Sequence, residues 1–454
     1  MAAWGNHGSS ISHLAQDHVY SILLLLPVNS ILSFAMTCKR FKSISSSDTL
    51  WESICRRDWG HDCVDAIISS YSVSKQQLLP WVELYRRVAS LDSVSCHRLI
   101  LPVGDDLVPS PRASHSLNFV SNCLVLFGGG CEGGRHLDDT WVAHIGKDIR
   151  TILHWQKINF GVPSGRFGHN CVVIGDSLVV FGGINDHGIR HNDTWIGRVV
   201  QNKSFGVTLF WRPLDVGPTK PPPRGAHAGC CIDNTRMLIY GGIGFDGVRL
   251  GDTWILELSE NLHFGTWHES VTCPSPPARS GHTLTRIDGT RMVLFGGRGL
   301  GYEVLSDVWL LDTSDGHIKW KQVLFDLRNI PGGISLPRVG HSATLMIGGR
   351  VLVYGGEDSE RHKKDDFWLL DVNSIPAFKM CAFPASSVTL LKWRKLKADG
   401  YIPDSRSFHA ACTDHSGRYL IVFGGMVDGL LLPAEPSGLR FDGKLFLGEL
   451  VLHL

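Results

Sequence analysis

Six copies of Arg-x-x-His run through the C-terminal three-quarters of the sequence. They pair a permanent cation with a side chain that can transfer protons or bind metals. The pairs are Arg112/His115, Arg166/His169, Arg224/His227, Arg279/His282, Arg338/His341 and Arg406/His409. Six equivalent copies on six units cannot form one active site if a ring keeps them apart. The repeat therefore favours a packing role for these residues over catalysis or metal binding.

Other reactive side chains also have plainer explanations. Cys171, Cys230, Cys231 and Cys412 follow the repeat histidines by two to four residues, inside apolar runs. We expect them to be small buried hydrophobic residues. His187 and His191 have a spacing seen in metal sites, but only Asp186 and Asp193 stand near them. A solvated loop is the favoured interpretation.

Further residues recur in phase with these pairs and define a repeat of four strands. Each pair is followed by an aromatic residue and two glycines, and five copies then carry Asp-x-Trp, as in Asp139/Trp141. Successive arginines are 54, 58, 55, 59 and 68 residues apart. The second copy predicts strands at 169–174, 177–181, 193–196 and 211–214. Near-continuous apolar runs such as Leu178-Val179-Val180-Phe181 indicate burial on both faces of a sheet.

The repeat residues have definite expected roles. The double glycines predict a positive φ or a close backbone approach. We expect the tryptophans to fill the wedges between neighbouring sheets. Buried Arg, Asp and His side chains must bond to the backbone or to one another.

These motifs resemble kelch repeats, which implies an all-β six-bladed propeller over residues 95–454. The sixth copy departs from the pattern, because an insert at 426–442 replaces Asp-x-Trp. We expect 445–454 to supply its third strand, with Phe446 in the place of the tryptophan. The stretch 95–101 would supply its fourth strand and close the ring, which removes the free sheet edges.

The N-terminal part differs in kind, because residues 13–60 are glycine-poor and leucine-rich with helical periodicity. This all-α stretch resembles an F-box, with Leu14, Leu26-Pro27, Cys38-Lys39, Phe41 and Trp51 in the motif's places. We expect residues 1–12 to be a tail and 61–94 a helical linker. The resemblance implies a Skp-type adaptor as partner, bound through Leu14, Val19, Leu26, Pro27, Ile31, Phe41 and Trp51.

Composition excludes several classes of protein. The chain has 454 residues with a formal net charge of +1, which argues against binding nucleic acid or membranes through bulk charge. The apolar run at 22–26 is too short to span a bilayer. The twelve cysteines form no Cys-x-x-Cys. We expect a protein of the nucleus or cytoplasm, or of both, with reduced thiols.

The loops between the second and third strands of each blade carry the more useful signal for binding. In five blades the second glycine of the pair and the aspartate are ten positions apart in the sequence. Basic side chains gather there: Arg135, His136, His187, Arg190, Arg249, Arg298, Arg361 and His362. Six of them, Arg135, His187, Arg190, Arg249, Arg298 and Arg361, are the predicted target-binding residues. Their charge favours an acidic or phosphorylated protein segment.

The order F-box then kelch resembles plant F-box/kelch-repeat proteins and the rear part of the light receptors that carry a LOV domain. Only twelve residues precede His13, so we expect no light sensing. The resemblance implies the substrate-recognition subunit of an SCF-type cullin ubiquitin ligase, without catalysis or cofactor. One alternative is a kelch scaffold outside ubiquitin transfer. Another is an iron-dependent specifier enzyme, but its motif is incomplete here, with Glu303 and Asp307 followed by Leu311 instead of His.

Overall fold

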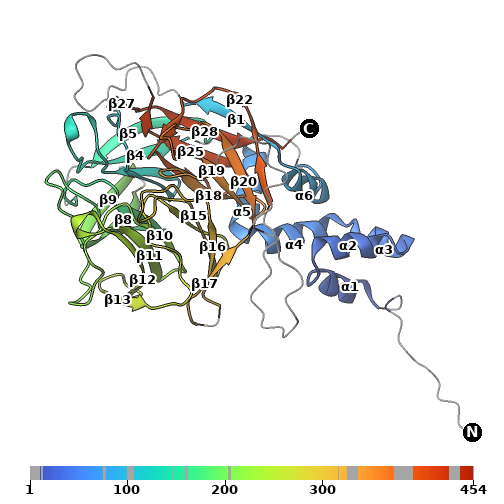
Figure 1. Ribbon diagram of the computed structural model, residues 1–454. Helices are drawn as coiled ribbons and strands as arrows, with labels where there is room; N and C mark the ends of the chain where they lie inside the picture. The colour runs from blue at the N-terminus through green and yellow to red at the C-terminus, as the bar shows by residue number, and fades with distance from the viewer. Residues whose placement is uncertain are drawn as a thin grey trace, which may run out of the picture. The chain divides into compact units, whose positions relative to one another are not determined.

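The computed structural model describes residues 11, 14–74, 78–99, 107–146, 148–158, 162–202, 206–314, 316–324, 336–372, 392–428 and 440–452. The chain divides into two compact units. One comprises Met1–Leu91 with Leu452–Leu454, and the other comprises Asp92–Val451. The first is helical and the second is built from strands (Figure 1). The segment 61–94, predicted as a linker, is shared between them. The predicted tail at 1–12 lies almost wholly outside the described residues.

The helical unit is built around α4. Its helices are α1 (Gln16–Leu23), α2 (Val28–Ala35), α3 (Lys39–Ser45), α4 (Asp48–Trp59), α5 (His61–Ser74) and α6 (Trp81–Ala89). Prolines precede α2 and α6, where a missing N–H costs no helical hydrogen bond. The backbone N–H of Trp81 donates to Asp48 Oδ1 at 2.6 Å, which fixes the start of α6 against the start of α4. Both α5 and α6 therefore belong to the core of this unit.

The second unit contains six blades, each with four antiparallel strands. In blades 1 to 3 the strands are β2 (Ser116–Val120), β3 (Cys123–Phe127), β4 (Thr140–Ile145), β5 (Ile152–Ile158), β6 (Asn170–Ile174), β7 (Ser177–Phe181), β8 (Thr194–Asn202), β9 (Gly206–Pro213), β10 (Ala228–Cys231), β11 (Arg236–Ile243), β12 (Arg249–Leu258) and β13 (Gly265–Ser270). In blades 4 and 5 they are β14 (Thr283–Arg286), β15 (Arg291–Phe295), β16 (Val308–Asp312), β17 (Lys319–Val323), β18 (Ser342–Met346), β19 (Arg350–Tyr354), β20 (Phe367–Asp371) and β21 (Lys392–Lys395).

The sixth blade closes the ring with strands from both ends of the unit. Its order is β24 (Ala410–Thr413), β25 (Tyr419–Phe423), β28 (Leu445–Leu450) and β1 (Ser93–Arg98). Phe446 lies opposite Val422, as Trp141 lies opposite Leu126 in the first blade. The predicted closure and the predicted place of Phe446 are thus confirmed. Figure 1 shows β1 beside β28.

Two additions to this blade were not predicted. A further strand, β22 (Lys397–Gly400), pairs with β1 in parallel. A small sheet of β23 (Arg406–Ser407), β26 (Met426–Val427) and β27 (Arg440–Phe441) lies in the insert region.

The hydrophobic core lies between blades, as predicted from the repeated tryptophans. One buried cluster joins Phe127 of blade 1 to Trp211 of blade 2, with ring centroids 5.4 Å apart. Trp211 also donates from Nε1 to Thr140 Oγ1 of blade 1 at 3.0 Å. Equivalent clusters join blades 2 and 3, 3 and 4, 4 and 5, and 6 and 1. Tryptophans therefore join the blades at these five interfaces, and between blades 5 and 6 Tyr354 contacts Phe446 instead.

The double glycines meet both predicted conditions. Gly182 and Gly183 have φ values of 69° and 104°. A Cβ on Gly182 would lie 2.7 Å from Arg224 O and 2.9 Å from His227 Cε1. Gly183 N donates to the same Arg224 oxygen at 2.9 Å. The glycines are therefore required where one blade's loop touches the next blade.

Candidate functional site

The repeat arginines are held by ion pairs inside each blade. In blades 1 to 5 the guanidinium donates to both oxygens of the Asp-x-Trp aspartate, at 2.5 to 3.0 Å. It also donates to the carbonyl of the first glycine, as Arg166 does to Gly182 O at 3.0 Å. In blade 6 the partner is Asp442, which lies 2.8 Å from Arg406. The predicted pairing is confirmed for the repeat arginines and aspartates, which are held as structural groups. It is not confirmed for His115, His227 and His282, whose ring nitrogens are buried without a hydrogen-bond partner.

The six repeat histidines line one central cavity of about 670 Å³. The expectation that the ring would keep the histidines apart is therefore wrong, because each stands directly before the innermost strand of its blade and all six line one space. Each histidine is only 5% to 8% exposed. Burial, with the neighbouring repeat arginine second, lowers the pKa of His169 to about 3. For His341, too, the pKa is lowered to about 3, and for the other four it lies well below the usual value.

Three of these histidines bond across the blade interface. His169 Nε2 lies 3.0 Å from Ser116 Oγ, and His341 and His409 make the same contact with Thr283 and Ser342 at 2.9 Å. Among the described residues, no group of three or more His, Cys, Asp or Glu is arranged to hold a metal ion. Neutral rings paired across blades are suited to packing the cavity wall.

The mouth of the cavity is formed by the loops that follow the double glycines. In each of blades 1 to 5 the residue just after the glycines pairs with the residue six positions later, making a small hairpin. In blade 3 these are Ile243 and Arg249, and in blade 5 Glu357 and Lys363. All four line the cavity, together with Arg298 of blade 4. In blades 3 to 5 these hairpin positions therefore bring four charged side chains and Ile243 to the cavity.

Three of the six predicted target-binding residues, Arg249, Arg298 and Arg361, come together at this mouth. Arg135, His187 and Arg190 are not among its lining residues. Arg190 instead donates to Gly188 O at 2.7 Å within its own loop. The loops of blades 1 and 2 thus carry basic side chains that do not join the site.

The charges at the mouth are partly compensated. Arg298 donates to Glu357 Oε1 at 3.0 Å, and Lys363 Nζ lies 2.6 Å from Asp428. Burial raises the pKa of Glu357, while Arg298 and Lys363 act against that rise. Arg249 stacks on Tyr302, with its Cζ 4.2 Å from the ring centroid.

Sequence reasoning missed Glu357 and Lys363 and the convergence of the six histidines. A signal for them did exist, because Glu357 directly follows the double glycine of blade 5, as Arg298 does in blade 4. Lys363 occupies the place that Arg249 holds in blade 3. The equivalent positions of blades 1 and 2 have the same pairing but do not line the cavity, so only the structure shows that Glu357 and Lys363 face it.

The second candidate site is the apolar surface of the helical unit. The structure buries four of the seven predicted adaptor residues, Val19, Ile31, Phe41 and Trp51, each at most 7% exposed. These four pack inside the unit and do not offer a contact surface, which corrects the prediction for them. Leu14 and Leu26 are half-buried and Pro27 is exposed.

Other apolar side chains are exposed on this unit. Leu25 is 85% and Met36 87% exposed, and Ile22 and Leu32 are also exposed. Arg57 Nη1 donates to the carbonyls of Leu24 and Leu26, both at 2.8 Å, so the turn that carries Leu25 is fixed. A rigid turn with an apolar tip in water is typical of a surface that another protein covers.

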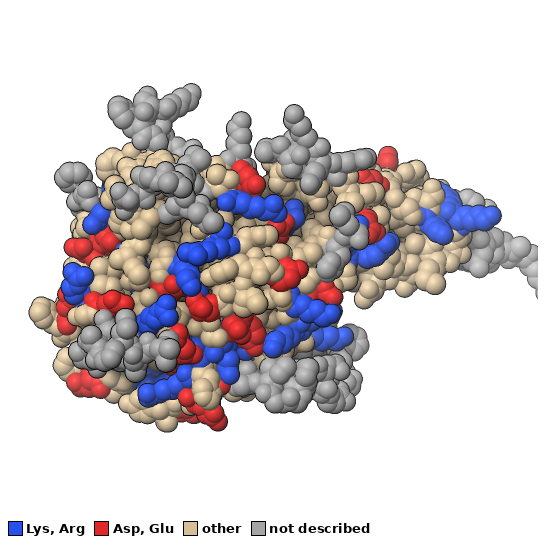
Figure 2. Space-filling view, turned by 90° about the horizontal axis from the view of Figure 1, so that it is seen from above, with Lys and Arg blue, Asp and Glu red and all other residues tan. Residues whose placement is uncertain are grey.

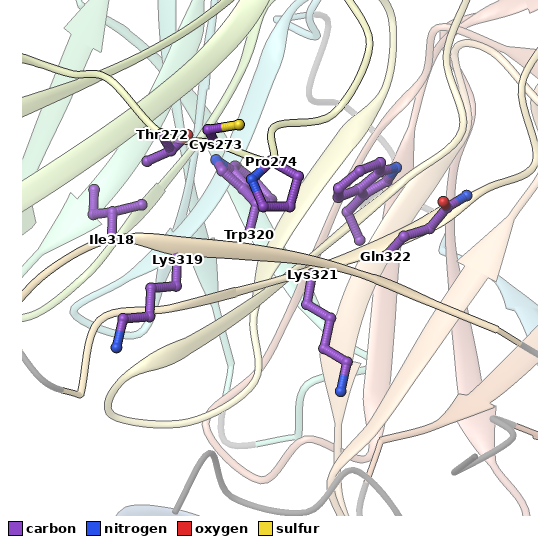
Figure 3. A pocket seen from close by; sticks show the side chains of 9 residues that line it. Thr272, Cys273, Pro274, Ile318, Lys319, Trp320, Lys321 and Gln322 are labelled. Atoms are coloured by element: carbon purple, nitrogen blue, oxygen red, sulfur yellow. The ribbon is translucent and has the colours of Figure 1, made fainter. Parts of the chain in front are cut away.

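A further cavity of about 610 Å³ lies against β17, at the outer part of the propeller (Figure 3). Trp320 and Pro274 lie on one side of the strand, whereas Lys319 and Lys321 point to the other. Cys273 at its edge is an exposed free thiol. This cavity brings together no set of groups with a recognisable chemistry.

The surface charge is mixed. Figure 2 shows Lys and Arg interspersed with Asp and Glu on the face it presents. This agrees with the net charge of +1. Within the described parts of the chain, no helix is both long and apolar enough to cross a membrane.

Comparison with known proteins agrees with this architecture. An F-box-like family model matches residues 18–57, and the KLHDC2/KLHL20/DRC7 Kelch-repeats domain matches 85–261 and 205–374. The F-box/kelch-repeat protein At1g51550 of Arabidopsis thaliana is 57% identical over 98% of this chain and 93% of its own length. Adagio protein 3 of the same plant is 29% identical over 89% of this chain, which spans 61% of that relative. Putative adagio-like protein 2 of Oryza sativa subsp. japonica is also 29% identical, over 89% of this chain and 60% of its own length. The chain belongs to the F-box/kelch-repeat family.

Proposed function

We propose that this protein is the substrate-recognition subunit of an SCF-type ubiquitin ligase. The helical unit would bind a Skp-type adaptor, and through it a cullin scaffold, while the propeller would hold the target protein. Such a subunit does no chemistry itself. By holding the target near the ubiquitin-charged enzyme it raises their effective concentration.

One observation carries this proposal. The F-box-like unit presents Leu25 and Met36 almost fully to water on a well-packed helical core. Covering a large apolar side chain contributes about 1.5–3 kcal/mol. An adaptor that buries both would therefore gain substantial affinity from them.

The competing enzyme hypothesis finds no support in the environment of Asp307. Both carboxylate oxygens accept hydrogen bonds from Arg279, and one also accepts from Trp309 Nε1 at 2.7 Å. This aspartate is therefore engaged in the blade and is poorly placed to bind iron.

The test is capture of a purified Skp-type adaptor by the full chain. A Leu25→Asp/Met36→Asp variant should lose at least about 100-fold in affinity, because two apolar contacts are replaced by charges. Val271 and Phe264 of the propeller are also exposed, at 91% and 60%. A Val271→Asp/Phe264→Asp variant is therefore the matched control and should bind normally. Adaptor binding that is absent in the wild type, or equal in both variants, would favour a scaffold outside ubiquitin transfer.

A further inference from the structure

The mouth of the propeller is asymmetric in its chemistry. Of the hairpin positions that face the cavity in blades 3, 4 and 5, four are charged, Arg249, Arg298, Glu357 and Lys363, and one, Ile243, is apolar. In blades 1 and 2 the corresponding pairs do not line the cavity. Among the described residues, a ligand at this opening would therefore meet the charged hairpin side chains in blades 3 to 5.

Arg249 is the cation at this mouth with the greatest need of an anion. It is only 9% exposed, and its Nε is buried without a hydrogen-bond partner. Within the described part of the chain it has no ion pair, whereas Arg298 is paired with Glu357 and Lys363 with Asp428. Burying an unpaired cation is costly. An anionic group from a ligand would offset that cost.

Exposed apolar side chains stand in the same loops as these cations. Phe245 is 79% exposed and lies between the two cavity-lining residues Ile243 and Arg249. In the next blade, Leu300 and Tyr302 are 62% and 67% exposed and follow Arg298. Tyr302 packs its ring over the Arg249 guanidinium. We call Phe245, Leu300 and Tyr302 the apolar platform; of the three, Tyr302 contacts the buried Arg249.

We propose that this mouth binds an acidic residue set within an apolar segment of a target protein. Its carboxylate would pair with Arg249, in the cavity that Arg361 also lines, while its apolar neighbours would cover Phe245, Leu300 and Tyr302. This proposal rests on the proposed function, because it names the kind of segment that the propeller holds. A carboxylate is favoured over a phosphate, because a doubly charged group costs more to desolvate beside aromatic and apolar side chains.

The test is a selection of peptides from a random 12-residue library displayed on phage, using the full chain as bait. We expect enriched peptides to carry Asp or Glu between apolar residues. An Arg249→Gln variant should bind an enriched peptide about 10- to 100-fold more weakly, as expected for a lost charge-assisted hydrogen bond. Arg249→Lys should retain part of the affinity. Tyr302→Ala should weaken binding, because the apolar platform is reduced.

The matched control is Arg190→Gln, because Arg190 has the same hairpin position in blade 2 but does not line the cavity. It should leave peptide affinity unchanged. Thermal unfolding of each variant separates lost binding from lost folding. The enriched peptide is then remade with Asn or phosphoserine in place of its acidic residue.

Loss with Asn and no gain with phosphoserine would support the proposal. Tenfold tighter binding of the phosphoserine peptide would overturn the choice of a carboxylate. Enrichment of uncharged or basic peptides, no enrichment, or full affinity in a folded Arg249→Gln variant would overturn the site itself. Adaptor capture does not involve this surface, so it reports on the proposed function independently.

Discussion

The ring of buried histidines predicts that the propeller loses stability in mild acid. His169 and His341 keep a pKa of about 3 when folded, whereas an unfolded histidine titrates near 6.5. A depressed pKa in the folded state means that the unfolded chain binds more protons below about pH 6.5. Stability is therefore full above that pH and falls as the pH drops towards 3.

The size of the effect follows from these two values. At pH 5.5 each of the two residues takes up about 0.9 proton on unfolding. This uptake lowers the free energy of unfolding by about 1.4 kcal/mol per residue relative to pH 7.5. Together they contribute about 3 kcal/mol, and the other four repeat histidines act in the same direction. The pKa of Glu357 is raised by burial, so the folded state binds this proton more readily than the unfolded state. Glu357 therefore opposes the loss of stability, by at most one proton.

The assay is urea unfolding at pH 7.5, 6.5 and 5.5, followed by tryptophan fluorescence. His169→Gln removes one titrating group, so its loss of stability between pH 7.5 and 5.5 should be smaller by about 1.4 kcal/mol. His187 lies in an exposed loop, so His187→Gln should show the same pH dependence as the wild type. A wild-type unfolding free energy that does not change over this range would refute the assignment of buried neutral histidines.

Two further predictions concern the ring itself. Asp442→Asn should destabilise the chain by about 3–5 kcal/mol, because it leaves the guanidinium of Arg406 buried beside a neutral group, whereas Asp428→Asn at an exposed pair should cost under about 1 kcal/mol. Equal melting temperatures for the two variants would contradict this role of Asp442. Gly355→Ala should cost more than Gly316→Ala. Both glycines have a positive φ, but a Cβ on Gly355 would lie 2.7 Å from His409 Cε1, whereas one on Gly316 meets nothing within 4 Å. Thermal unfolding compares them, and similar losses would show that the approach between blades has no special cost.

Much of the propeller was predictable because its signals are local. Gly182 and Gly183 mark a backbone conformation, and Trp211 marks a wedge, without reference to distant residues. The closing strand β1 could be expected because blade 6 lacked a fourth strand of its own. The parallel strand β22 could not, since 397–400 is a short exposed stretch with no apolar alternation.

The candidate site was predictable only in part. Arg249, Arg298 and Arg361 were identified by charge and loop, but the same criteria also chose Arg135 and Arg190. The same hairpin pairing occurs in blades 1 to 5, yet its positions line the cavity in blades 3, 4 and 5 and not in blades 1 and 2, a difference that sequence spacing does not reveal.

The errors in the helical unit and in blade 6 have different physical causes. Val19 and Trp51 fit the apolar pattern, but that pattern cannot say whether the chain itself or a partner covers them. Asp442 was not recognised because it reaches Arg406 from two positions earlier than the usual aspartate.

The pairing of β1 with β28 has a consequence for the order of events during synthesis. β1 is made before any blade, yet its antiparallel neighbour in the final sheet is made after all of them. All strands of blades 1 to 5 are therefore made before the ring can close. The ring closes only when β28 pairs with β1. A chain that ends before β28 leaves an unpaired sheet edge at each end of its row of blades.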